Sequence, residues 1–226
     1  MTVKEMAGQL MELTPQMWCH YLFSRDLLAA RIADAEKQRM AALALECGQM
    51  AARKLMGIYA TRDPFQMASS LGLEVKMSTT PMKGERVVFA YFTPPDMIEI
   101  MQEPLDMYAV LMEDPDTASL LPDVDTVRRM LLAHELFHFY EESHPGIYTQ
   151  RERVRLWSFL GYQHLSPLRA LSEIAAMECS RSLCGIRYCP NILDVLLFCG
   201  YSTEYAQRIF NDIMAKGREY GEAHRQ

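Results

Sequence analysis

Long apolar runs are missing from this 226-residue sequence. No stretch approaches the roughly 20 consecutive apolar residues that a membrane-spanning helix needs. Charged residues or proline interrupt every apolar run among the first thirty residues, which is unlike the core of a signal peptide. We therefore expect a cytoplasmic protein with no membrane partner.

Cysteine pairs with metal-binding spacing are missing as well. The sequence contains six cysteines, and no two of them form the CxxC pair of zinc knuckles and redox sites. Cys179, Cys184 and Cys189 are evenly spaced, but a spacing of five residues does not keep side chains on one helical face. We interpret the cysteines as reduced and mostly buried thiols.

Positive charge is also scarce, because 23 Lys and Arg face 29 Asp and Glu, for a net charge of −6. Proteins that bind nucleic acid through its phosphates need a basic surface. Arg151, Arg153 and Arg155 lie close together, but three arginines in a short stretch are typical of a solvated face. We expect no direct nucleic-acid partner.

Good helix formers and few strands predict a mainly helical α+β fold. Residues from about 22 to 58 favour one or two long helices. Asp63 and Gly72 bracket a short helix that leads into a strand. β-branched and aromatic residues on both sides of Pro94-Pro95-Asp96 predict a β-hairpin near residues 86–101. This hairpin would form a small antiparallel sheet.

Further helices are predicted in the second half of the chain. Asp123 or Asp125 can cap a helix that stops before Pro145. Ser166-Pro167 predicts the start of another, which Gly185 would close. We divide the chain into an N-terminal helical extension (residues 1–60) and a larger domain with C-terminal helices (residues 61–226).

The sequence HELFH at residues 134–138 matches the HExxH motif of zinc peptidases. His134 and His138 are one helical turn apart, so both side chains point from the same face and can bind one ion. Glu135 is rotated by about 100° from His134, which suits a general base that acts on a metal-bound water. The sequence therefore predicts a Zn²⁺ site with His134 and His138 as ligands and Glu135 as the catalytic base.

A catalytic zinc ion normally has three protein ligands, and three residues compete for the third position. His144 has the spacing of one HExxH subclass, but Glu141 replaces the glycine that turns the chain there. Glu178 can form a surface ion pair with Arg181, three residues further on. Glu173 is favoured over both.

The helix face of Glu173 explains this preference. Ala170, Ala176 and Ser180 share that face, and their small side chains would allow a close approach to the HExxH helix. An ion pair with Arg169 is the alternative role for Glu173, since charges four residues apart often pair on helices.

The sequence resembles the ImmA/IrrE family of metallo-endopeptidases over about half of its length. The resemblance rests on DPFQMASSLGLEV, FAYFTPPDMIEI, RRMLLAHELFHFY and SEIAAMEC. It implies a zincin-like fold with the hairpin packed on the HExxH helix, and it assigns Glu173 as the third ligand. Phe137 departs from the glycine that is usual in the family, and residues 103–121 and 147–165 look like insertions.

The resemblance implies a zinc-dependent endopeptidase that cleaves a protein or peptide substrate, with DNA-binding repressors among the candidates. Tyr140, His144, Tyr148 and His164 are candidate donors to the oxyanion. The alternative is a zinc-binding regulatory or interaction protein that does not cleave, because Phe137 could narrow the cleft. The intact Glu135 favours the enzyme.

Overall fold

The computed structural model describes residues 1–79, 88–159 and 162–224, with most of them in helices. For Leu156 to Phe159 it describes the backbone alone. The N-terminal elements are α1 (Val3–Met11), α2 (Pro15–Ser24), η1 (Ala29–Arg31) and α3 (Asp34–Tyr59). The next elements are α4 (Pro64–Ser70), β1 (Glu74–Ser78), β2 (Ala90–Thr93), β3 (Met97–Met101), α5 (Gln102–Leu111), α6 (Pro115–Ala118) and α7 (Val124–Ser143). The C-terminal part contains α8 (Tyr148–Arg151), β4 (Val154–Phe159), β5 (Tyr162–Ser166), α9 (Arg169–Cys184), η2 (Pro190–Ile192), α10 (Leu193–Cys199) and α11 (Thr203–Ala223).

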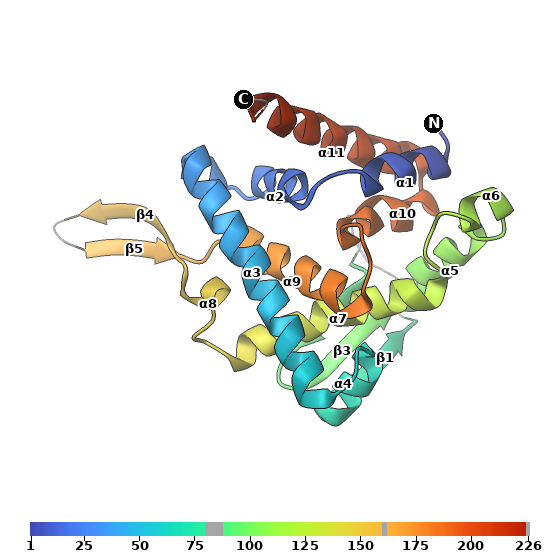
Figure 1. Ribbon diagram of the computed structural model, residues 1–226, viewed down its shortest axis with the longest axis horizontal. Helices are drawn as coiled ribbons and strands as arrows, with labels where there is room; N and C mark the ends of the chain where they lie inside the picture. Colours follow the sequence, from blue (N-terminus) through green and yellow to red (C-terminus); the bar gives the residue numbers. More distant parts are fainter. Residues whose placement is uncertain (80–87, 160–161, 225–226) are drawn as a thin grey trace.

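Three long helices form the centre of the molecule, with α9 between α3 and α7 (Figure 1). Gly48 of α3 lies against the backbone of α9, where an added Cβ would be 2.2 Å from the Ala175 carbonyl oxygen. The close approach of α3 and α9 therefore depends on a glycine at this position.

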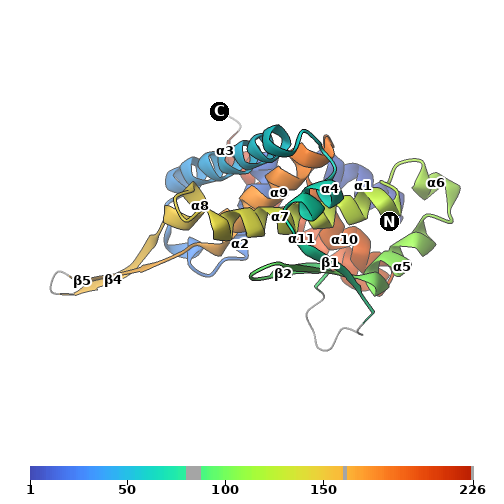
Figure 2. The same cartoon turned by 90° about the horizontal axis from the view of Figure 1, so that it is seen from below.

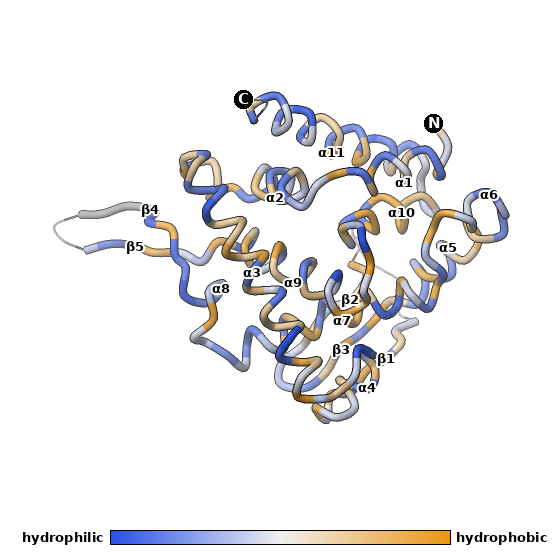
Figure 3. The backbone as a smooth tube through the Cα atoms, viewed as in Figure 1, coloured by the Kyte–Doolittle hydropathy of each residue, from blue (hydrophilic) through white to orange (hydrophobic). Residues whose placement is uncertain are grey.

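One buried hydrophobic cluster joins the N-terminal helices to the rest of the chain. Met6, Trp18 and Ala51 belong to the same cluster as Leu136 and Leu196. Figure 3 shows that the outer helix α11 alternates between hydrophilic and hydrophobic residues, as expected of a helix that covers this core with one face. This shared core contains residues from both sides of the predicted boundary near residue 60, and the division into two units stays a prediction.

A three-stranded sheet packs on α7, with the strand order β1-β3-β2. The described part of the predicted hairpin is confirmed, because β2 and β3 pair in antiparallel fashion around Pro94-Pro95-Asp96. Residues 86 and 87 lie outside the described residues. Phe92 of β2 meets Phe139 of α7 edge to face, with ring centroids 5.7 Å apart. Figure 2 shows the sheet on one side of α7.

The prediction of a small antiparallel sheet was wrong in part, because the sheet is mixed. The strand β1 pairs with β3 in parallel, with Val75 opposite Ile98. The short helix α4 comes before β1. The two strands that flank β3 run in opposite directions, with β1 parallel to β3 and β2 antiparallel to it. Strand polarity of this kind depends on how the chain returns to the sheet, which composition does not reveal.

Several predicted helix ends are confirmed. Asp63 caps α4 by accepting a hydrogen bond from the Phe65 amide (3.0 Å), and Asp123 caps α7. Gly185 ends α9 with a φ angle of 68°. The predicted cap at Ser166-Pro167 was wrong, because α9 begins at Arg169 and its Ala170 amide donates to Asp26, far away in the sequence.

The two stretches that look like insertions contain regular structure. Residues 103–121 include most of α5 and all of α6, and residues 147–165 include α8 and most of a second antiparallel hairpin, β4–β5. Figure 1 shows this hairpin projecting from the helical body.

The cysteines agree with the prediction of mostly buried thiols. All six cysteines are free, and four of them are buried: Cys19, Cys47, Cys179 and Cys199. Among the helices in the described ranges, none has the length and apolar character required to cross a bilayer.

The contact at Gly48 generates a stability prediction. Gly48→Ala should lower the free energy of unfolding by about 1–3 kcal/mol, because the new methyl group meets backbone that cannot rotate away. Chemical denaturation measures this loss.

Gly57→Ala is the matched control, since Gly57 is in the same helix and has no atom within 4 Å of an added Cβ. Alanine there should raise the free energy of unfolding by about 0.5–1 kcal/mol. Equal effects of the two substitutions would contradict the close α3–α9 contact.

Candidate metal centre

The helix α7 places His134 and His138 one turn apart on the face toward α9. The Nε2 atoms of the two rings are 3.0 Å apart, and the ring centroids are 4.7 Å apart at 71°. On other faces of the helix, Leu132, Leu136 and Phe137 are completely buried. Burial on those faces fixes the rotation of α7 and therefore the direction of both histidines.

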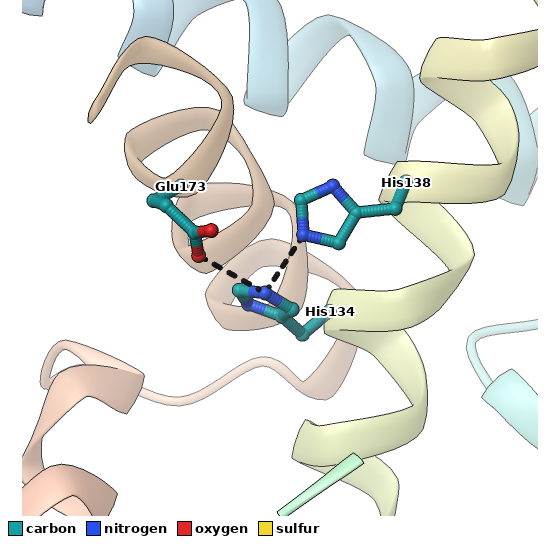
Figure 4. Close-up of side chains that lie close together, drawn as sticks. All are labelled: His134, His138 and Glu173. Carbon is teal, nitrogen blue, oxygen red and sulfur yellow. Dashed lines mark hydrogen bonds and ion pairs between the residues drawn. The ribbon is translucent and has the colours of Figure 1, made fainter. Parts of the chain in front are cut away.

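Glu173 on α9 completes a cluster with the two histidines (Figure 4). Its Oε2 is 3.5 Å from Nε2 of His134, and one ligand atom from each of the three residues lies within 4.8 Å of the others. Its Oε1 accepts a hydrogen bond from Arg169 Nε (3.2 Å). One oxygen of the Glu173 carboxylate therefore faces His134 and the other faces Arg169, the two neighbours expected from the sequence.

The spacing of these atoms suits a small tetrahedral cation. Zinc bonds of about 2.0–2.1 Å in tetrahedral geometry place neighbouring ligand atoms roughly 3.4 Å apart. The observed separations of 3.0 Å between the histidine nitrogens and 3.5 Å between His134 and Glu173 are close to this value. Two imidazole nitrogens and one carboxylate oxygen form a common donor set of catalytic zinc sites.

The charges within the cluster stabilise one another. Burial on its own would raise the pKa of Glu173, but the hydrogen bond and charge of His134 lower it to about 2. Burial would likewise lower the pKa of His134, yet the neighbouring carboxylates of Glu173 and Glu135 raise it. Glu173 is therefore ionised at neutral pH, which is the form that binds a cation.

Glu135 is 7 % exposed and lines a cleft of about 670 Å³ together with His134 and Glu173. Within the described part of the chain, its carboxylate has no hydrogen-bond or ion-pair partner. Because Glu135 lines the cleft, its carboxylate can contact a water molecule or a substrate there.

The other two candidates for third ligand have different environments. His144 is exposed beyond the end of α7, where its ring stacks on Tyr140 at a centroid distance of 4.0 Å. Glu178 forms the expected ion pair with Arg181 (2.6 Å) and also accepts from Gln49 (2.9 Å). The pair was predicted at the surface, but Glu178 is buried. Neither residue belongs to the cluster around His134.

The cleft has polar residues that the sequence did not indicate. Tyr140, His144, Tyr148 and His164, the candidate oxyanion donors, do not line it. Its lining also includes Tyr21 and Arg25 at the end of α2, Asn191 in η2 and Asp194 in α10. Arg25 donates to the Tyr21 hydroxyl (3.0 Å), and burial raises the pKa of Asp194 to about 6. No local motif marks these residues, because they lie on separate elements that come together only when the chain folds.

In comparisons with known proteins, no family model, curated protein or solved structure matches the chain. The site is therefore characterised by its own geometry.

The position of Glu173 generates a prediction about metal affinity. Glu173→Gln should weaken zinc binding by more than about 100-fold, since loss of a direct ligand should exceed the 10–100-fold typical of residues that only support ligands. Competition with a coloured chelator measures the affinity.

Glu178→Gln removes the same charge from the same helix, five residues away, and should change zinc affinity less than about threefold. Both variants should be tested for folding by circular dichroism. Wild-type affinity in a folded Glu173→Gln variant would exclude Glu173 as a ligand.

Proposed function

We propose that this protein is a zinc-dependent endopeptidase that hydrolyses a protein substrate in the cytoplasm. The observation that carries the proposal is the meeting of His134, His138 and Glu173 at one point, beside the buried Glu135 and an open cleft. A zinc site that serves only structure is normally closed by four protein ligands. Three donors next to a cleft leave one position for water or substrate.

Each residue has a distinct task in this proposal. His134, His138 and Glu173 would hold the ion, which when bound polarises a peptide carbonyl and lowers the pKa of water. Glu135 would accept the proton of the attacking water and transfer it to the departing amine. Among the described residues, no hydrogen bond or ion pair engages the Glu135 carboxylate, so it is available for both proton transfers.

The cleft has room for a segment of peptide. Binding sites for ligands commonly have volumes of about 300–1,000 Å³, and this cleft falls within that range at about 670 Å³. Its walls combine apolar side chains, such as Phe89 and Phe198, with the charged Arg25 and Asp194. The resemblance to ImmA/IrrE peptidases supports a DNA-binding repressor as a substrate candidate.

Phe137 gives no support to a protein that binds without cleaving. Its side chain is completely buried and does not line the cleft, so it does not narrow the path to the metal centre. The ring instead lies beside His138, with centroids 6.0 Å apart. The phenylalanine that stands here in place of the family's glycine therefore packs in the core beneath α7.

Glu135→Gln is the decisive variant for catalysis. It should retain zinc but cleave at least about 10²-fold more slowly, because general-base catalysis contributes roughly 10²–10⁴-fold. A library of randomised peptides, incubated with the zinc-loaded protein and analysed by mass spectrometry, would reveal cleavage whatever the natural substrate is.

Candidate repressors form the second set of substrates. Glu142→Gln serves as the control, since Glu142 is an exposed acid on the same helix. Equal cleavage by wild type and Glu135→Gln would refute the assigned base. Stoichiometric zinc with no cleavage in either substrate set would favour a regulatory binding protein.

A further inference from the structure

A second acid lies behind the metal centre, on the far side of the His138 ring. Nδ1 of His138 is 3.4 Å from Oε2 of Glu141 and 3.4 Å from Oγ of Ser172. The Ser172 hydroxyl also donates to Oε2 of Glu141 at 2.5 Å. His138 therefore contacts the metal cluster with Nε2 and this polar pair with Nδ1.

Without a partner, the charged carboxylate of Glu141 would destabilise the fold at this position. Glu141 is 6 % exposed, and burial of a carboxylate costs free energy unless the carboxylate is paired. It also lies in the last turn of α7, where the helix dipole disfavours a negative charge. A buried acid that the helix itself disfavours indicates a requirement outside the helix.

The hydrogen bonds define which nitrogen of His138 carries the proton. The single hydrogen of the Ser172 hydroxyl is used in its short bond to Glu141. Both oxygen atoms that face Nδ1 are then acceptors, so Nδ1 must be the donor. Neutral His138 consequently presents an unprotonated Nε2 toward His134 and Glu173, which is the form that binds a metal.

His134 has no such support. Its Nδ1 is enclosed and has no hydrogen-bond partner within the part of the chain that the structure describes. Among the described residues, the two histidines of the motif therefore differ, because a buried acid faces Nδ1 of His138 and none faces Nδ1 of His134. Ser172 also precedes Glu173 in the sequence, so one turn of α9 contacts both sides of the centre.

We propose that Glu141 and Ser172 are positioning residues that fix the tautomer and direction of His138 for metal binding. This inference rests on the proposed function, because it assigns a role toward the same ion. Carboxylates that accept from the distal nitrogen of a metal-bound histidine typically raise metal affinity by 10–100-fold.

Zinc affinity is the first test. Glu141→Ala should weaken binding by about 10–100-fold, and Ser172→Ala should weaken it by a smaller factor. Ser172→Thr retains the hydroxyl and should restore most of the affinity. Glu142→Ala removes an exposed neighbouring acid and should leave the affinity unchanged.

The tautomer of His138 is the second test, and it needs no metal. Long-range ¹H–¹⁵N spectra of the metal-free protein, recorded well above the pKa of imidazole, should show the proton on Nδ1 in wild type. Glu141→Ala should shift it toward Nε2. Glu141→Gln, which removes the charge and keeps the size of the side chain, provides the same comparison if Glu141→Ala does not fold.

The two measurements separate the possible failures. Zinc binding by wild type with equal affinity in folded Glu141→Ala and Ser172→Ala would overturn the positioning role and leave the metal centre intact. Failure of wild type to bind zinc would refute the proposed function. In that case an unchanged His138 tautomer in the variants would overturn the inference separately.

Discussion

The contact between α7 and α9 is the constraint on which the site depends. Neither helix contains a complete donor set, because the two histidines are on α7 and Glu173 is on α9. The buried Ser180 hydroxyl of α9 donates to the Met130 carbonyl of α7 (2.8 Å), one turn before His134. This bond lies two helical turns from Glu173 and fixes how far α9 slides along α7. A small slide would separate Glu173 from both histidines.

The packing of α3 on α9 supports this contact from the other side. Gly48 allows α3 to press against the α9 backbone at Ala175, two residues after Glu173. The helix that contains the acid is thus held between two neighbours and cannot move away from α7 without opening the core. The N-terminal region contributes more than support, because Asp26 accepts from the first turn of α9 and Arg25 lines the cleft. Residues far apart in sequence therefore determine the shape of the site.

Most of the features predicted correctly from sequence were local ones, and the proximity of Glu173 to the histidines is an exception. The spacing of His134 and His138 determines their common face, and Asp63 marks a helix start through a side chain that bonds within its own turn. Glu173 was singled out because small residues favour close helix packing, and the structure brings it to the histidines. The parallel pairing of β1 with β3 was missed, since partner and direction depend on distant contacts. The wall formed by α2 was missed for the same reason.

Proton and metal would compete for the same atoms at this centre. The carboxylates of Glu173 and Glu135 raise the pKa of His134, so they favour a positive charge at that imidazole. A divalent cation held as proposed would satisfy the same electrostatic demand more completely, because ligand atoms of His134, His138 and Glu173 lie within 4.8 Å of one another. His138 is prepared differently, since Glu141 and Ser172 keep its proton on the nitrogen that faces away from the cluster. A cation at this centre would thus meet a lone pair of His138 that already faces the cluster.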